Sequence, residues 1–118
     1  MEFNWKTQPN KELVDAFLSL SSREEAERFL RDLMTEGEIT EFAKRLQTAE
    51  LLSAKVPYST IERETGFSST TVARVSKWLS KGTGGYKEII TKLGSTKLTT
   101  SHHHNPSKIG KGLSLTRT

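Results

Sequence analysis

Apolar residues recur three and four positions apart along most of the first half of the chain, which is the spacing of one face of an α-helix. Two of the helices that this pattern predicts have clear start signals. Ser21 and Ser22 each precede a glutamate by three residues, as in a capping box. Thr35 precedes Glu38 in the same way. The predicted helices are residues 10–20, 22–34 and 35–54.

A second pattern, in residues 58–79, predicts two short helices joined by a sharp turn, with the sequence YSTIERETGFSSTTVARVSKWL. Gly66 stands at the turn, where the backbone often needs a positive φ. Ser68 fits as the N-cap of the second helix, which has one apolar stripe for burial. The stripe consists of Val72, Val75 and Leu79, and Ile61 and Thr65 face inward from the first helix.

Two interpretations fit this helix–glycine–helix run: a helix-turn-helix that binds DNA, or an ordinary αα-corner in a helical domain. The first turn of the second helix carries small hydroxyl and methyl groups, and cations follow, which suits a DNA major groove. Glu62 counts against DNA binding, because a small residue usually stands there so that the two helices can pack closely.

The candidate DNA contacts lie opposite the buried stripe. We expect base edges to be contacted by Ser69, Thr70 and Ala73. We expect phosphates to be bound, with help from the helix N-termini, by Ser59, Thr60, Arg63, Lys77 and Lys81.

The charge of the chain changes sign along its length, around a formal net charge of +4 over 118 residues. Residues 1–54 hold seven Lys and Arg against eleven Asp and Glu, whereas residues 55–93 hold seven against three. Residues 94–118 add four cations and no acid. The basic excess therefore begins where the helix-turn-helix pattern begins, which favours a nucleic-acid partner over a solvated charged face.

The ends of the chain lack this patterning. Three glycines at 82, 84 and 85 follow the second short helix, and a last helix is predicted over residues 86–93. We therefore expect a flexible lead-in over residues 1–9, one helical domain over 10–93, and a disordered basic tail rich in Ser, Thr and Gly over 94–118. The tail is a candidate for sequence-neutral binding to phosphates.

Other functional classes have little support in the sequence. The chain has no cysteine, and its three histidines, His102, His103 and His104, stand together in the tail, a polar run rather than a metal site. The common nucleophile–base pairs are thus missing from the predicted domain, so we expect no enzyme, no cofactor and no metal. No apolar run has the length of a membrane span and no secretion signal is visible, so a cytoplasmic location is expected.

Two long segments together resemble the Trp-repressor-like superfamily, in particular its YerC/YecD branch of small bacterial helix-turn-helix regulators. The segments are LMTEGEITEFAKRLQTAELL at 33–52 and YSTIERETGFSSTTVARVSKWLSKGTGGYKEII at 58–90. The resemblance covers about residues 10–93. It implies an all-α fold of about six helices, an intertwined homodimer, and operator binding by the fourth and fifth helices.

The resemblance also implies a place for an effector. In tryptophan-binding repressors one arginine binds the amino acid's carboxylate and a second stacks on its indole, positions that Arg74 and Arg45 match, while Thr35 matches a polar residue at the pocket mouth. Val75 and Trp78, however, stand where that family has glycine and serine. The added volume predicts that tryptophan does not bind. Trp78, interpreted as a core residue, would take the indole's place with Arg45 against its ring.

The sequence as a whole therefore predicts a dimeric, sequence-specific DNA-binding regulator that reads a two-fold symmetric site. A repressor is expected, because a small dimer without an activation segment is more often a repressor. No small-molecule corepressor and no membrane partner are expected. The alternative is a protein-interaction module that keeps the same helical fold without reading DNA.

Overall fold

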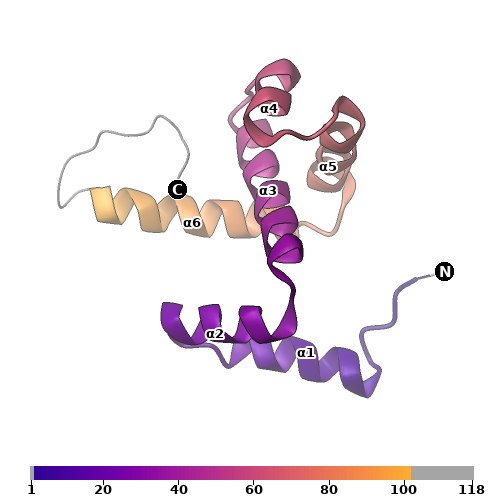
Figure 1. The fold of residues 1–118 in the computed structure, drawn as a ribbon, viewed down its shortest axis with the longest axis vertical. Coiled ribbons are helices and arrows are strands. Elements are labelled where there is room, and N and C mark those ends of the chain that lie inside the picture. The colour runs from indigo at the N-terminus through magenta and orange to yellow at the C-terminus, as the bar shows by residue number, and fades with distance from the viewer. Residues whose placement is uncertain (1, 102–118) are drawn as a thin grey trace. The chain divides into compact units, whose positions relative to one another are not determined.

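The computed structural model describes residues 2–101, and their side chains as far as residue 94. In this part of the chain the regular elements are α-helices and there is no strand (Figure 1). The six helices are α1 (Gln8–Leu18), α2 (Arg23–Leu33), α3 (Glu36–Ser53), α4 (Tyr58–Thr65), α5 (Ser69–Lys81) and α6 (Gly85–Ser101). The predicted all-α fold of about six helices is thereby confirmed.

The chain divides into two compact units, one up to Thr40 and one from Glu41 onward, so that α3 begins in the first and ends in the second. The first unit holds α1 and α2. The rings of Phe17 and Phe29 meet edge to face, with 5.6 Å between their centroids. No side chain of α1 or α2 is fully buried.

Helix α1 begins at Gln8, two residues earlier than the pattern predicted, and ends at Leu18 rather than Leu20. Thr7 is the reason for the early start: its side chain accepts a hydrogen bond from the Asn10 N–H at 3.4 Å. Pro9 is tolerated in the first turn because its missing N–H would have no partner within the helix. The helix therefore includes two residues that had been assigned to the lead-in.

The capping boxes predicted for the next two helices differ in outcome. At α3 the exchange is complete: Thr35 Oγ1 accepts from the Glu38 N–H at 3.1 Å, and the Glu38 carboxylate accepts from the Thr35 N–H at 2.9 Å. At α2 only one of two overlapping boxes has its N-cap bond, from Glu25 N–H to Ser22 Oγ. The Glu25 carboxylate accepts from Ser21 instead, at the backbone N–H (2.9 Å) and the hydroxyl (3.0 Å).

The core of the second unit is small, and its fully buried apolar side chains are Ala49, Ile61, Val72 and Val75. Two buried threonines satisfy their hydroxyls within their own helices, as Thr48 Oγ1 donates to Lys44 O and Thr65 Oγ1 to Ile61 O, each at 2.8 Å. The inward positions predicted for Ile61, Thr65 and the valines of α5 are confirmed.

Helix α3 ends through its own backbone. Lys55 adopts a positive φ of 64°. The Val56 N–H donates to Leu51 O and the Lys55 N–H to Leu52 O, both at 3.0 Å, which is the Schellman pattern. Pro57 then caps α4, and its carbonyl accepts from the Thr60 and Ile61 N–H groups at 3.1 Å.

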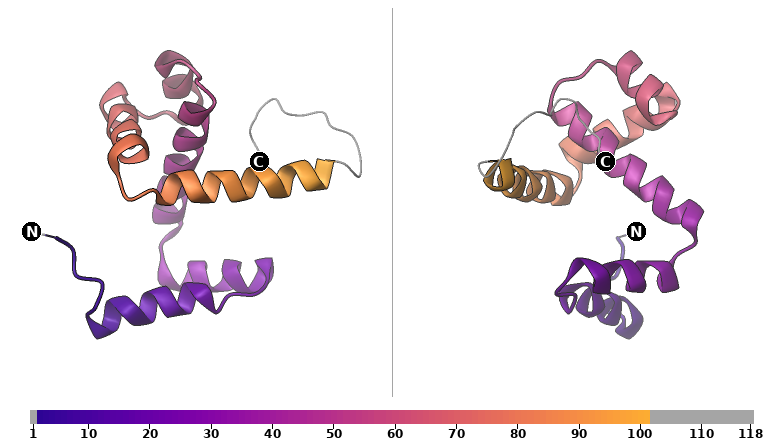
Figure 2. Two further views of the ribbon diagram at one scale, coloured as in Figure 1. Left: turned by 180° about the vertical axis from the view of Figure 1, so that it is seen from behind. Right: turned by 60° about the vertical axis from the view of Figure 1, so that its left-hand side comes forward.

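Helix α6 extends to Ser101, eight residues beyond the predicted end at Leu93. Both views of Figure 2 show α6 starting beside the end of α5 and extending away from α4 and α5. The predicted end was wrong because the Ser/Thr/Gly-rich composition from Gly94 onward was taken as the start of a disordered tail. A glycine inside a helix costs only about 1 kcal/mol and removes no hydrogen bond. The remainder of the predicted tail, with His102, His103 and His104, lies outside the described residues.

Candidate nucleic-acid interface

The turn between α4 and α5 is held by hydrogen bonds from each of its residues. Gly66 has φ 78° and ψ 2°, the left-handed conformation predicted for it, and its N–H donates to Glu62 O at 2.9 Å. The Phe67 N–H donates to Thr65 Oγ1 at 3.1 Å. Ser68 Oγ accepts from the Thr71 N–H at 3.2 Å and so caps α5 as expected. The turn therefore has the local geometry of a helix-turn-helix.

The burial of Val72 and Val75 determines which face of α5 meets solvent. Because these valines are fully buried, the opposite face of the helix is exposed. The predicted base-contact residues Ser69, Thr70 and Ala73 are all exposed, and so are Lys77 and Lys81. On α4, Ser59 and Arg63 are exposed, whereas Thr60 is half-buried.

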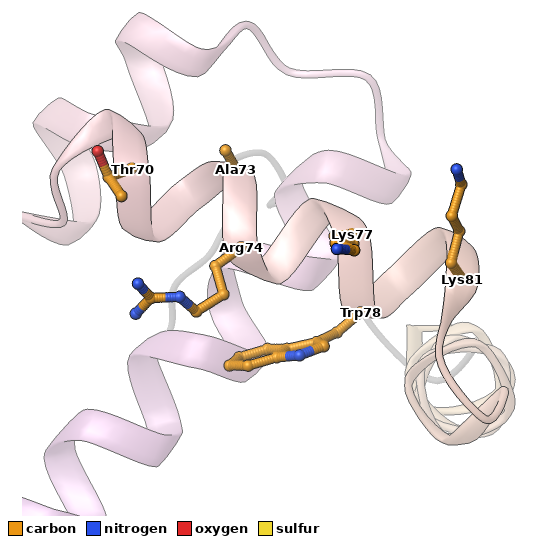
Figure 3. A pocket seen from close by; sticks show the side chains of 6 residues that line it. All are labelled: Thr70, Ala73, Arg74, Lys77, Trp78 and Lys81. Carbon is orange, nitrogen blue, oxygen red and sulfur yellow. The ribbon is translucent and has the colours of Figure 1, made fainter.

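One open hollow of about 570 Å³ lies along this exposed face of α5 (Figure 3). It is lined by Thr70, Ala73, Arg74, Lys77, Trp78 and Lys81. Four of the eight predicted DNA contacts are thus brought together on one surface. Ser69 and the three candidates from α4, Ser59, Thr60 and Arg63, do not line this hollow.

The cations of the hollow form no ion pair within the part of the chain that the structure describes. The two ion pairs recorded there join Arg31 to Glu36 at 3.4 Å and Arg45 to Glu41 at 3.6 Å. Arg74, Lys77 and Lys81 take part in neither. Three positive charges therefore face solvent together without a carboxylate partner, an arrangement that attracts a polyanion.

Trp78 connects α5 with α3. The guanidinium of Arg45 lies over its ring, with Arg45 Cζ 5.5 Å from the ring centroid, so the predicted pairing of these two residues is confirmed. The same guanidinium lies 5.2 Å from the ring centroid of Phe42. Trp78 is nevertheless 40% exposed, and its interpretation as a core residue was wrong. The ring also lines the hollow along the exposed face of α5.

A second hollow, of about 560 Å³, lies between the end of α5 and the start of α6. Its lining is mostly apolar and consists of Leu46, Trp78, Gly82, Thr83, Gly85, Tyr86 and Ile89. Loss of solvent around the phenol raises the pKa of Tyr86, and the positive charge of Arg45 opposes that shift. Tyr86 therefore stays neutral at physiological pH, and the hollow carries no charge of its own.

The three residues that the resemblance assigned to an effector pocket have other roles in the structure. Thr35 caps α3, Arg45 is held between Glu41 and the Trp78 ring, and Arg74 lines the hollow of α5. Val75 is fully buried in the core. The sequence analysis placed Arg74 with the effector candidates and not among the DNA contacts, although its position four residues after Thr70 puts it on the same exposed face of α5.

The described residues contain no group of three or more His, Cys, Asp or Glu that could hold a metal ion. None of the helices described is long and apolar enough to cross a bilayer.

Comparisons with known proteins point to one family. The model of the Trp repressor protein family matches residues 8–94. The uncharacterized protein YerC of Bacillus subtilis (strain 168) is 37% identical over 90 residues, covering 76% of this chain and 86% of YerC.

Two solved structures are similar in fold and sequence. A TrpR-like protein from Eubacterium eligens ATCC 27750 superposes with a TM-score of 0.73 at 36% identity, covering 76% of this chain and 93% of that one. A proposed Trp repressor from Staphylococcus aureus gives a TM-score of 0.71 at 37% identity, with 75% and 89% covered.

Proposed function

The chain belongs to the Trp repressor protein family, and on that premise we propose that it is a sequence-specific DNA-binding regulator that acts as a repressor. The family consists of regulatory DNA-binding proteins rather than enzymes, in agreement with the prediction that this chain is not an enzyme. One observation supports the proposal most: the exposed face of α5 gathers Thr70, Ala73, Lys77 and Lys81 around a hollow whose cations have no carboxylate partner among the described residues.

Side-chain chemistry indicates which residues of this surface contact bases and which contact phosphates. Hydroxyl and methyl groups from Ser69, Thr70 and Ala73 are short enough to let α5 approach base edges, and they can hydrogen-bond or contact a thymine methyl. Lys77 and Lys81 are long and charged, so they bind phosphates on either side of the groove. The exposed start of α4 adds phosphate contacts from Ser59, Thr60 and Arg63.

A second copy of the chain completes the proposal. Large apolar side chains remain exposed on α1, α2, α3 and α6, and the first unit buries no side chain of α1 or α2 completely. A free chain with so little buried apolar surface is marginal, and a homodimer would cover these faces. The side chains concerned are Leu13, Val14, Phe17, Leu18, Leu33, Phe42 and Ile89. Two α5 helices about 34 Å apart would then read a two-fold symmetric site.

We further propose that free tryptophan is not the effector. Trp78 already provides an indole ring over which the Arg45 guanidinium lies, a pairing worth roughly 0.5–2 kcal/mol. Val75 fills its site completely. Side chains of the protein itself thus hold the DNA-binding helix α5 in place without a bound effector. We also propose that the protein is located in the cytoplasm, where its DNA is. Calorimetry that detects micromolar binding of L-tryptophan would contradict this proposal.

The function is tested by a mobility shift on genomic DNA fragments in the presence of excess competitor DNA. We expect the full chain to retard a subset of fragments without any added small molecule. If light scattering shows a dimer but no fragment shifts even at low salt, the chain is instead a protein-interaction module on the same fold.

A further inference from the structure

Arg74 lies on the exposed face of α5. Successive residues of an α-helix are about 100° apart, so Arg74 lies about 40° around the axis from Thr70, whereas Ala73 lies about 60° away on the other side. Lys77 and Lys81 each lie about 20° from Thr70. The stripe Thr70, Arg74, Lys77, Lys81 is therefore continuous, and all four residues line one hollow.

No side chain of the described residues holds the guanidinium of Arg74. The ion pairs and cation–π contacts recorded for arginine use Arg31 and Arg45, and none uses Arg74. Arg74 itself is exposed. The guanidinium of Arg74 is thus exposed and has no partner among the described side chains, and two lysines lie beside it. Its planar set of N–H donors can bind two oxygens of a phosphate or a carboxylate at once.

The neighbour of Arg74 directs the side chain. Figure 3 shows the side chains of Arg74 and Trp78 leaving α5 on the same side, while that of Ala73 leaves it on the opposite side. The Arg45 guanidinium lies over the Trp78 ring, and this ring lines the same hollow as Arg74. Arg74 therefore lies at the flank of the base-reading residues, and the flanks of a helix in the major groove meet the phosphate backbones.

From these observations we propose that Arg74 is a DNA-phosphate contact that fixes the register of α5, rather than part of a small-molecule site. This inference rests on the proposed DNA binding and adds one residue to the surface that performs it. A guanidinium that neutralises one phosphate releases counterions, so it contributes to the salt dependence of binding but not to sequence preference.

The test compares the full chain with Arg74→Gln on two duplexes of equal length, a selected genomic fragment and a random sequence, at several salt concentrations. Because the proposed dimer carries two copies of Arg74, we expect R74Q to lower the slope of log K against log salt by about 1.8, which is about 0.9 for each copy. We expect it to weaken both duplexes by the same factor. Arg74→Lys should retain most of the slope, because the charge remains.

Arg28→Gln on α2 is the matched control, since it removes the same charge from another exposed arginine, and it should keep the parent slope. Two results would overturn the inference: a parent slope in R74Q, or a loss confined to the selected fragment, which would indicate a base contact. If the parent chain binds neither duplex, the proposed function itself fails, so the two failures are distinguishable.

Discussion

Trp78 links the exposed face of α5 to α3. It lines both hollows, and Arg45 of α3 lies over its ring at 5.5 Å. Helix α5 therefore reaches α3 through a half-exposed aromatic residue, whereas its two valines are fully buried.

Replacing Trp78 by alanine should destabilise the second unit by roughly 1–3 kcal/mol, less than a fully buried tryptophan would lose, because the ring is 40% exposed. DNA affinity should fall as well. Thermal unfolding of the variant measures the first effect. Trp5→Ala is the control, since Trp5 is 61% exposed and pairs with Phe3 in the lead-in. Equal losses in both variants would show that Trp78 does not link α5 to α3.

At the residue scale, the sequence predicted the conformation or contact of a residue where a specific residue type or family position indicates it. Gly66 could be placed because few other residues accept its φ of 78°, and the Arg45–Trp78 pairing followed from the family resemblance. Lys55 could not be predicted at its φ of 64°, since lysine has no preference for that conformation. The exposure of Trp78 depends on how much of the ring its neighbours cover, which no single sequence position determines.

Helix ends separate the predictable elements from the rest. The start of α3 was predictable, because the Thr35–Glu38 exchange involves four consecutive residues and no tertiary contact. The start of α1 and the end of α6 were missed by two and eight residues. Both errors came from assigning residues without an apolar pattern to the ends of the chain, the lead-in up to Pro9 and the tail from Gly94. A proline in the first turn or a single glycine in a helix does not prevent the helix from forming.

The start of α2 carries a pH dependence. The pKa of Glu25 is lowered below 4.5, chiefly by the hydrogen bond from the Ser21 N–H and then by that from the Ser21 hydroxyl. A lowered pKa stabilises the folded chain above about pH 4.5, and this contribution disappears as the pH falls through the lowered value.

Glu25→Gln should therefore remove part of the acid sensitivity of unfolding. The parent should unfold at a higher temperature than E25Q above pH 4.5, and the difference should shrink as the solution is acidified. Glu24→Gln provides the matched charge change one residue away. The assignment fails if E24Q alters the pH profile as much as E25Q does.

At the scale of the whole molecule, the small core is the reason that we expect a second copy of the chain to cover the exposed apolar side chains. The fully buried apolar side chains of the described residues are four, and Leu18 remains 77% exposed. We predict a dimer by sedimentation, with an unfolding midpoint that rises with protein concentration, because folding and association are then linked. A monomer whose midpoint is independent of concentration would contradict the dimer.

Selection of bound fragments from genomic DNA, followed by sequencing, tests the central claim most directly. The account predicts a two-fold symmetric motif whose half-sites are centred about one helical turn apart, or a multiple of it. A bulky residue in place of Thr70 should change the selected half-site, whereas Lys77→Gln should keep the motif and weaken binding to all sequences. No shared motif among the fragments, or the same half-site from the Thr70 variant, would contradict the claim that α5 reads DNA sequence.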